Sequence, residues 1–237
     1  MRLRDNRLAV IGGSSGIGAA VARAALDAGM TVHIGSSNAT KLDLTLERLG
    51  AGATGAVVDV SDEASVEAFF AGAGPLDHLA YTAGDWTRRR TQIGPKFDLE
   101  DAKASFDTRL WGALLAIKHA LPTLSASGSI TLTSGLYAHR PAKGTSLTTA
   151  LTGATEHLVQ GLAIDLAPIR VNVVTAGFID TEAWAAMPDE AKQGVTARQA
   201  IPRPGHPDEV AEAFLYFMRG SYTTGQSAIV DGGGLFA

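Results

Sequence analysis

The stretch Gly12-Gly13-Ser14-Ser15-Gly16-Ile17-Gly18 decides the fold of this 237-residue chain. It follows the short apolar run Leu8 to Gly12 and precedes the helical pattern Ile17–Ala28. Glycines permit a tight turn and let the backbone approach a ligand closely, while the free N–H groups and dipole of the following helix attract an anion. Because the loop lies between the first predicted strand and the first predicted helix, it indicates a turn that binds the pyrophosphate of a dinucleotide.

Short apolar runs alternate with longer helical patterns along the rest of the chain. Their apolar residues occupy both faces, as in strands buried between helices. Further strands are expected at Thr31–Gly35, Gly55–Val60, Leu76–Thr82, Ser129–Ser134, Arg170–Thr175 and Ser227–Val230. Further helices are expected at Ala39–Leu49, Glu63–Phe70, Leu99–Leu121, Thr149–Ala167 and Pro207–Met218, and the stretches Ala83–Phe97 and Phe178–Gly205 are expected to be irregular. The pattern predicts an α/β, Rossmann-type doubly wound parallel sheet of about seven strands with helices on both faces, a three-layer α/β/α domain spanning residues 1–237.

Composition excludes several classes of function. Twenty lysines and arginines against 24 acidic residues give a net charge of −4, whereas a nucleic-acid-binding protein needs a basic surface. The chain has no cysteine, and its six histidines form no close pair, so no metal site is expected. The sequence contains no signal-peptide pattern and no membrane-spanning apolar run, so we expect a cytoplasmic protein without a membrane partner. Charged residues make up 19%, below the typical ~25%, which suggests that an oligomer covers part of the surface.

Five segments together resemble the short-chain dehydrogenase/reductase family over essentially the whole chain. They are Gly12–Gly18, Tyr81-Thr82-Ala83-Gly84, Leu166–Asn172, Ala176–Thr181, and the C-terminal Thr224-Gly225-Gln226 with Val230–Gly233. The resemblance implies a nicotinamide cofactor. The implied cofactor-binding residues are Gly12, Ser14, Ser15, Gly16, Ile17, Gly18, Ser36, Ser37, Asn38, Asp59, Val60, Thr82, Ala83, Gly84, Thr133, Ile179 and Thr181.

The end of the second predicted strand favours NADP(H) over NAD(H). NAD-binding proteins place an acid there to accept from the ribose 2′-OH, but this chain has Ser36-Ser37-Asn38 instead. Two hydroxyls, an amide and Lys41 nearby can donate to a 2′-phosphate. The alternative is that Ser36-Ser37-Asn38 only caps the next helix and that Lys41 is a solvated surface lysine.

The catalytic set that the resemblance implies is largely replaced. The family uses a serine, a tyrosine and lysine one helical turn apart, and an asparagine; the matching positions here are Ser134, Thr148, Thr152 and Arg109. No tyrosine lies between Ala138 and Gln160, so a shifted alignment cannot restore the motif. A threonine hydroxyl is too weakly acidic to deliver a proton, and arginine stabilises negative charge but is a poor proton donor.

Three interpretations of this set remain open. The first is a reductase that transfers hydride to a small carbonyl, imine or iminium substrate, with Arg109 and Ser134 as its main polar pair. Its replacement proton donor is Tyr137, His139, Lys143 or water, although each of these side chains taken singly is more simply an ordinary loop residue. The second is a non-catalytic NADP(H)-binding sensor or regulatory subunit. The third is a non-redox isomerase or cyclase on the same scaffold. Arg109 is as readily explained by a salt bridge at a helix interface.

The remaining features concern the substrate and partners. Trp184 follows Thr181, where the family has a mobile substrate lid, and is the best candidate for a pocket wall among the three tryptophans Trp86, Trp111 and Trp184. The run Arg88-Arg89-Arg90 is expected to be a solvated face rather than a guide for anionic substrates. The resemblance implies that the long helices 99–121 and 149–167 pair across a two-fold axis in a homodimer or homotetramer.

Overall fold

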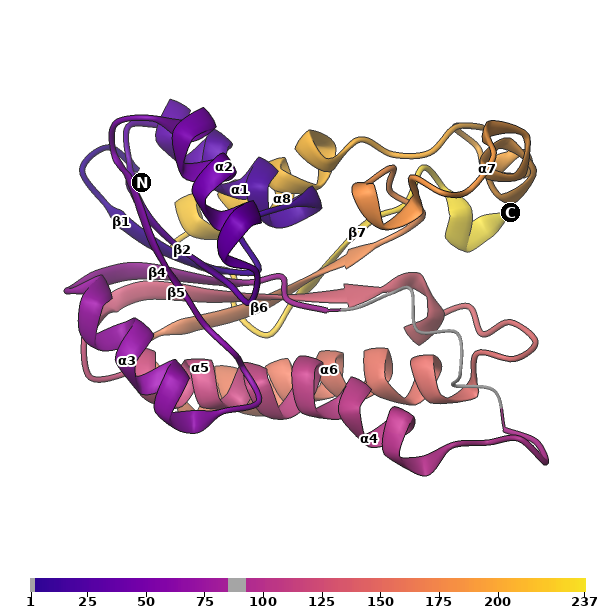
Figure 1. Ribbon diagram of the computed structural model, residues 1–237, viewed down its shortest axis with the longest axis horizontal. Coiled ribbons are helices and arrows are strands. Elements are labelled where there is room, and N and C mark those ends of the chain that lie inside the picture. Colours follow the sequence, from indigo (N-terminus) through magenta and orange to yellow (C-terminus); the bar gives the residue numbers. More distant parts are fainter. Residues whose placement is uncertain (1–2, 85–92) are drawn as a thin grey trace.

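The computed structural model describes residues 3–84 and 93–237, and its centre is one parallel sheet of seven strands (Figure 1). The strand order is β3-β2-β1-β4-β5-β6-β7, and every pair of neighbours is parallel. The strands are β1 (Arg7–Ile11), β2 (Thr31–Ser36), β3 (Ala53–Val57), β4 (Leu76–Tyr81), β5 (Leu124–Gly135), β6 (Arg170–Ala176) and β7 (Ser227–Val230). The predicted doubly wound Rossmann-type sheet is therefore confirmed.

Helices cover both faces of the sheet (Figure 1). One layer contains α1 (Gly16–Asp27), α2 (Ala39–Leu49) and α8 (Pro207–Arg219), and the other contains α3 (Glu63–Ala73), α4 (Leu99–Phe106), α5 (Gly112–Ala120) and α6 (Ser146–Asp165). Alternate residues of β1 show why both layers form: Ala9 and Ile11 belong to one apolar cluster and Leu8 and Val10 to the other. The strand buries apolar side chains on both faces, so each face needs a helical cover.

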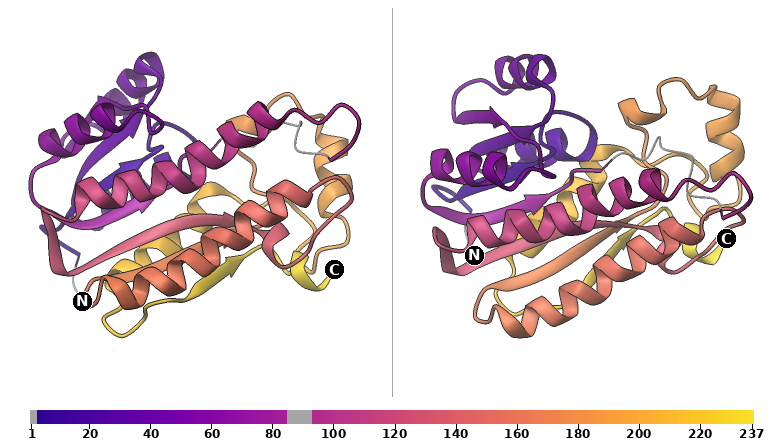
Figure 2. Two further views of the ribbon diagram at one scale, coloured as in Figure 1. Left: turned by 90° about the horizontal axis from the view of Figure 1, so that it is seen from below. Right: turned by 60° about the horizontal axis from the view of Figure 1, so that its bottom comes forward.

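The expected helix 99–121 is interrupted. Between α4 and α5 the chain forms a π-helical turn, η1 (Asp107–Trp111), and all three segments continue in one direction beside α6 (Figure 2). No proline marks the interruption in the sequence, and in the structure the turn accepts a hydrogen bond from Tyr81, described below. The second expected helix, 149–167, begins earlier and ends earlier, as α6.

Two further expectations about local structure were wrong. The third strand ends at Val57, not Val60, because β3 is an edge strand whose pairing with β2 finishes there. The stretch after β6 was expected to be irregular, but it contains the helix α7 (Asp189–Thr196) and the short 3₁₀ turn η3 (Glu182–Trp184). Two other 3₁₀ turns are η2 (Leu136–Ala138) and η4 (Gly234–Phe236).

The strand order places the site. β1 lies between β2 and β4, so the connections leave β1 and β4 in opposite directions and open a crevice at their carboxyl ends, where doubly wound sheets bind ligands. The loops after β1, β4, β5 and β6 all lie at this edge of the sheet, and α7 lies beyond the end of β6, on the right of Figure 1. Among the described residues, no helix is long and apolar enough to cross a bilayer.

Candidate functional site

The glycine-rich loop leaves β1 and touches the end of β4. Gly12 has φ +84, and a Cβ at this position would lie 2.7 Å from the main-chain nitrogen of Ala83. A Cβ on Gly18 would lie 2.2 Å from the carbonyl oxygen of Gly12. Both positions therefore require glycine, because the loop, the following helix and β4 approach more closely than any side chain allows. These contacts bring the predicted residues Gly12, Gly18 and Ala83 together at the crevice.

The first turn of α1 binds a carboxylate. The N–H of Gly16 donates to Oε2 of Glu182 at 2.9 Å, whereas Ser15 makes no side-chain capping hydrogen bond and the turn contains no acidic residue of its own. A carboxylate at this point stands in for an anionic ligand at the positive end of the helix. The loop therefore fits the phosphates of a dinucleotide, as the sequence predicts.

Hydroxyl groups tie the loop to its neighbours. Oγ of Ser14 lies 2.7 Å from Oγ of Ser36, and Oγ1 of Thr82 donates to the carbonyl of Ile11 at 2.9 Å. Oγ1 of Thr133 donates to the carbonyl of Tyr81 at 2.9 Å, which links β5 to β4. The predicted residues Ser14, Ser36, Thr82 and Thr133 thus hold the edge of the sheet in shape rather than all pointing at a ligand.

The segment Ser36-Ser37-Asn38 has divided roles. The Ser36 hydroxyl is buried and hydrogen-bonded within the loop, and Oδ1 of Asn38 caps α2 by accepting from the N–H of Lys41 at 2.9 Å. The capping alternative is therefore correct for Asn38. Ser37, just after β2, and Lys41, in the first turn of α2, are exposed. They remain the groups with which this chain can donate to a 2′-phosphate.

Two other predicted contacts differ in detail. Asp59 lies two residues beyond β3, and its Oδ1 accepts from the N–H of Ser61 at 2.9 Å and from its hydroxyl at 2.6 Å. These hydrogen bonds from Ser61 lower the pKa of the Asp59 carboxyl. Val60 is buried. The side chain of Asp59 is exposed and already accepts the hydrogen bonds from Ser61. Its contact with the adenine therefore stays a prediction.

The segment after β6 forms the opposite wall. Ile179 is buried and pairs through its backbone with Gly205, while the side chain of Thr181 faces Gly16, whose added Cβ would lie 3.1 Å from it. The structure therefore brings Thr181 to the glycine loop, as the resemblance implies. It places the Ile179 side chain in the core, so only its backbone can face a cofactor.

The hydroxyls at two of the predicted catalytic positions, Ser134 and Thr152, donate to main-chain carbonyls of α6. Ser134 Oγ donates to the main-chain carbonyl of Thr152 at 3.1 Å, and Thr152 Oγ1 donates to the carbonyl of Thr148 at 2.8 Å. Ser134 is 1% exposed and Thr152 is 2% exposed. Thr148 and Thr152 lie one turn apart on α6, as predicted, but the hydroxyl protons of Ser134 and Thr152 are engaged by backbone acceptors.

Arg109 lies on the π-helical turn beside the end of β4. A Cβ on Gly84 would lie 2.8 Å from Nε of Arg109, so the guanidinium passes directly over this glycine. The turn is held by Tyr81, whose hydroxyl donates to the carbonyl of Thr108. Burial raises the pKa of Tyr81, with the charge of Arg109 opposing, so the phenol keeps its proton and remains a donor. No sequence pattern predicts this role of Tyr81.

The Enoyl-(Acyl carrier protein) reductase family matches residues 11–234 of the chain. A curated relative, short-chain dehydrogenase/reductase ATR9 of Stachybotrys chlorohalonatus, is 35% identical over 98% of this chain and 97% of its own length. The chain belongs to the short-chain dehydrogenase/reductase family.

Solved structures of this family superimpose on the whole chain. A small-chain dehydrogenase in complex with NADPH is 34% identical with a TM-score of 0.84, covering 98% of this chain and 100% of its own. The MalC Reductase/Diels-Alderase from Malbranchea aurantiaca is 30% identical with a TM-score of 0.90, covering 99% and 98%. The chain is thus an oxidoreductase of the short-chain dehydrogenase/reductase type by its family.

A buried carboxylate lies next to the predicted catalytic positions of this short-chain dehydrogenase/reductase. Glu156 is one turn beyond Thr152 on α6, and its Oε2 lies 2.8 Å from Nε2 of His139. Its Oε1 accepts from Oγ1 of Thr175 at 2.6 Å, and Thr175 pairs with Ser134 across β5 and β6. Nothing in the sequence pattern links these residues. All three loop candidates for proton transfer, Tyr137, His139 and Lys143, are exposed, and His139 has a carboxylate partner in Glu156.

The substrate side is defined in part. Trp184 packs on Phe178 with ring centroids 5.2 Å apart and follows Glu182, which contacts Gly16, by two residues; its place as a pocket wall stays a prediction. Trp111 is exposed on η1. Trp86 and the run Arg88-Arg89-Arg90 lie outside the described residues. Within residues 3–84 and 93–237, no group of three or more histidines and acids is arranged to hold a metal ion.

Proposed function

We propose that this short-chain dehydrogenase/reductase is an NADP(H)-dependent reductase with a non-standard acid/base set. Its substrate is a small molecule with a carbonyl, imine or iminium group. When bound, the nicotinamide supplies the hydride. The chain itself orients the substrate and the cofactor, and Arg109 and Ser134 are its polar groups at the reacting end.

The observation that carries this proposal is the hydrogen bonding of the Ser134 and Thr152 hydroxyls, on β5 and α6. Ser134 donates to the carbonyl of Thr152, and Thr152 donates to the carbonyl of Thr148. A neutral alcohol is a very weak acid, and these two protons already have backbone acceptors. Reduction of a ketone needs a proton on the oxygen, but an iminium carbon accepts hydride without one. The site therefore favours an iminium over a ketone.

Arg109 narrows the substrate class further. Its guanidinium stays protonated and lies over Gly84 at the carboxyl end of β4. A cationic substrate carbon is repelled by this charge unless the substrate also carries an anionic or electron-rich group that Arg109 can bind. We infer a substrate that combines an imine or iminium with a carboxylate or an amide carbonyl.

The choice of NADP(H) rests on the end of β2. No carboxylate is present there, and Ser37 and Lys41 are exposed where a 2′-phosphate would lie. A relative that is 34% identical was solved in complex with NADPH, which supports the same preference. NAD(H) is the less favoured alternative.

A second candidate function is a cyclisation or isomerisation on the same scaffold. The relative MalC is described as a reductase and Diels-Alderase, so one scaffold of this kind serves both reactions. In this chain, engaged hydroxyls and a fixed guanidinium suit the orientation of a reactive intermediate as well as hydride delivery. The third interpretation, a non-catalytic NADP(H) sensor, would be supported if the protein binds NADPH but converts no substrate.

The test uses purified protein, NADPH deuterated at C4 and three matched substrates. These are a cyclic iminium carrying a carboxylate, the same iminium without the carboxylate, and the corresponding ketone. We expect the first substrate to give a deuterated product. The second should react at about one tenth of that rate or more slowly, and the ketone should react little. Arg109→Gln should abolish the preference for the carboxylate, whereas Arg23→Gln, an exposed arginine on α1, should not.

The remaining outcomes separate the candidates. An altered product without deuterium supports cyclisation or isomerisation. Saturable NADPH binding without any product supports the sensor. A ketone reduced as fast as the iminium would contradict the argument from the engaged hydroxyls.

A further inference from the structure

The positive end of α1 is occupied by a side chain from the far end of the sequence. The N–H of Gly16, the first residue of the helix, donates to Oε2 of Glu182, which is 166 residues away. The helix provides no acid in its own first turn, and Ser15 contributes no side-chain cap. Glu182 therefore supplies the only anion that the described residues bring to this amide.

The same amide belongs to the loop that fits a pyrophosphate. The free N–H groups of the first turn are the donors for such a ligand, because the N-terminal N–H groups of a helix lack intrahelical partners. One N–H cannot donate fully to a carboxylate and to a phosphate at once. Two anions at a single helix end also repel each other. A bound dinucleotide and the observed position of Glu182 are thus incompatible at this point.

We propose that Glu182 is an internal competitor for the cofactor: its carboxylate occupies part of the pyrophosphate site in the free chain and is displaced when the dinucleotide binds. This inference rests on the proposed function, since it assumes that the loop binds a dinucleotide. It assigns to Glu182 the role of setting cofactor affinity, and with it the rate at which the cofactor leaves.

The surroundings of Glu182 permit this displacement. Asp180 is fixed, because its carboxylate pairs with Lys192 at 2.8 Å and its N–H donates to the carbonyl of Gly205 at 2.8 Å. Glu182, two residues later, is exposed, and the contact with Gly16 is its one side-chain hydrogen bond among the described residues. The side chain can therefore turn away from α1 without breaking the anchor at Asp180.

Displacement of Glu182 is expected to reach Trp184. Both residues belong to the same short turn, η3, in which the N–H of Trp184 donates to the carbonyl of Thr181 at 2.9 Å. Trp184 packs on Phe178 with ring centroids 5.2 Å apart. We expect the turn to shift when Glu182 leaves Gly16, which would couple cofactor binding to the packing of Trp184 on Phe178.

The first test measures the dissociation constant of NADPH by the fluorescence of the bound nicotinamide. Wild type, Glu182→Gln, Glu182→Ala and Glu190→Gln are compared at one salt concentration. Glu190 is an exposed acid on α7, so its substitution makes the same charge change nearby. We expect both Glu182 variants to bind NADPH about three- to tenfold more tightly, the range of one charged contact at a helix end, and Glu190→Gln to match wild type.

The outcomes distinguish the competitor role of Glu182 from the proposed function. Equal affinity in all four proteins, or weaker binding by the Glu182 variants, overturns the competitor role and leaves the proposed function intact. Absence of binding in all four overturns both. Binding by the Glu182 variants alone would support the inference in its strongest form.

A second test reads the coupling to Trp184. In a Trp86→Phe/Trp111→Phe background, Trp184 is the single tryptophan, and NADP⁺ is used because it does not absorb the emitted light. Its emission should change on saturation with NADP⁺, and adding Glu182→Gln should reduce that change. An emission that does not respond to saturating NADP⁺ would contradict the coupling even if the affinities behave as expected.

Discussion

The hydroxyl of Tyr81, at the end of β4, donates to the main-chain carbonyl of Thr108 in the π-helical turn η1. Gly112 allows this contact, since a Cβ there would lie 2.6 Å from the Tyr81 hydroxyl oxygen. The π turn carries Arg109, whose guanidinium passes over Gly84. Tyr81 thereby acts as a positioning residue for Arg109, without touching the reacting atoms itself.

Tyr81→Phe tests this relationship. The substitution removes only the buried hydroxyl and leaves the Thr108 carbonyl without this donor, so the free energy of unfolding should fall by about 1–2 kcal/mol. Urea denaturation measures this loss of stability. The turnover of a carboxylate-bearing substrate should be lower in Tyr81→Phe than in wild type, as it should be in Arg109→Gln. Tyr216→Phe removes the same atom from an exposed tyrosine and serves as control. If the two variants are equally stable, the hydroxyl does not hold the turn.

Ser37→Asp should change the cofactor preference. Ser37 is exposed between β2 and α2, and a carboxylate there would repel a 2′-phosphate but accept from a ribose 2′-OH. We expect NADPH affinity to fall by about tenfold or more and NADH affinity to rise. Ser127→Asp adds the same charge at the exposed start of β5, where no change is expected. An unchanged ratio of the two dissociation constants would place the 2′-phosphate elsewhere.

Glu156→Gln should destabilise the loop after β5. The substitution keeps the shape of the side chain but removes the charge that pairs with His139 and accepts from Thr175. Because the Glu156 side chain is only 10% exposed, the expected loss is about 1–2 kcal/mol in urea denaturation. Glu212→Gln, on the exposed face of α8, is the matched control. If His139 donates a proton to carbonyl substrates, Glu156→Gln should also slow any residual ketone reduction and leave iminium reduction unchanged.

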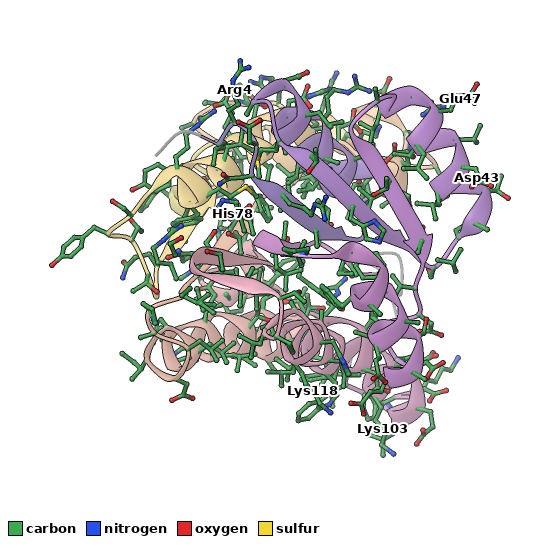
Figure 3. All side chains as sticks on the ribbon, turned by 90° about the vertical axis from the view of Figure 1, so that its left-hand side faces the viewer. Arg4, Asp43, Glu47, His78, Lys103 and Lys118 are labelled. Atoms are coloured by element: carbon green, nitrogen blue, oxygen red, sulfur yellow. The ribbon has the colours of Figure 1, made fainter. Side chains whose placement is uncertain are left out.

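His78 should make the protein lose stability in mild acid. It is buried between Asn6 and Ser129, inside the molecule, whereas the labelled charged residues lie at the rim (Figure 3). Burial lowers the pKa of His78 to about 4; Asp77 opposes this shift and Arg170 reinforces it. The unfolded chain therefore takes up the proton first, so this stabilisation is complete above pH 6.5 and is lost as pH falls towards 4.

The size of this effect is about 2 kcal/mol between pH 7.5 and pH 5. His78→Gln cannot take up the proton, so urea denaturation should show a smaller decrease of the unfolding free energy between the two pH values. The pKa of His33 is also lowered by burial and acts in the same direction, so only the difference from wild type reports on His78. His157→Gln, an exposed histidine on α6, should keep the wild-type decrease. An equal decrease in His78→Gln would show that His78 does not titrate as described.

The two long helices should mediate self-association. Trp111 on η1 is 55% exposed and Ile164 on α6 is 78% exposed, and burying such a side chain contributes about 1.5–3 kcal/mol. We propose that these helices form the interface of the homodimer or homotetramer expected from the sequence. Trp111→Glu combined with Ile164→Glu should lower the mass measured by light scattering by half or more. Tyr222→Glu, at a fully exposed loop position, should leave it unchanged.

The sequence by itself determined the sheet and the phosphate loop. Gly12 and Gly18 allow the close approach of loop, helix and β4, and the alternation of apolar runs requires helices on both faces. The sequence also placed Thr148 and Thr152 one helical turn apart, and the structure has both on α6, although the expected helix 149–167 began one residue after Thr148. These features depend on local geometry and on periodicity, both of which can be read along the chain.

Only the tertiary structure decided which partners these residues have. Tyr81 and Thr108 are 27 positions apart, and Gly16 and Glu182 are 166 apart, so no local pattern pairs them. The π turn, the engaged hydroxyl of Ser134 and the carboxylate at α1 all arise where the loops after separate parallel strands meet at one edge. The order of the strands in the sheet creates those contacts, and that order is a property of the folded chain as a whole.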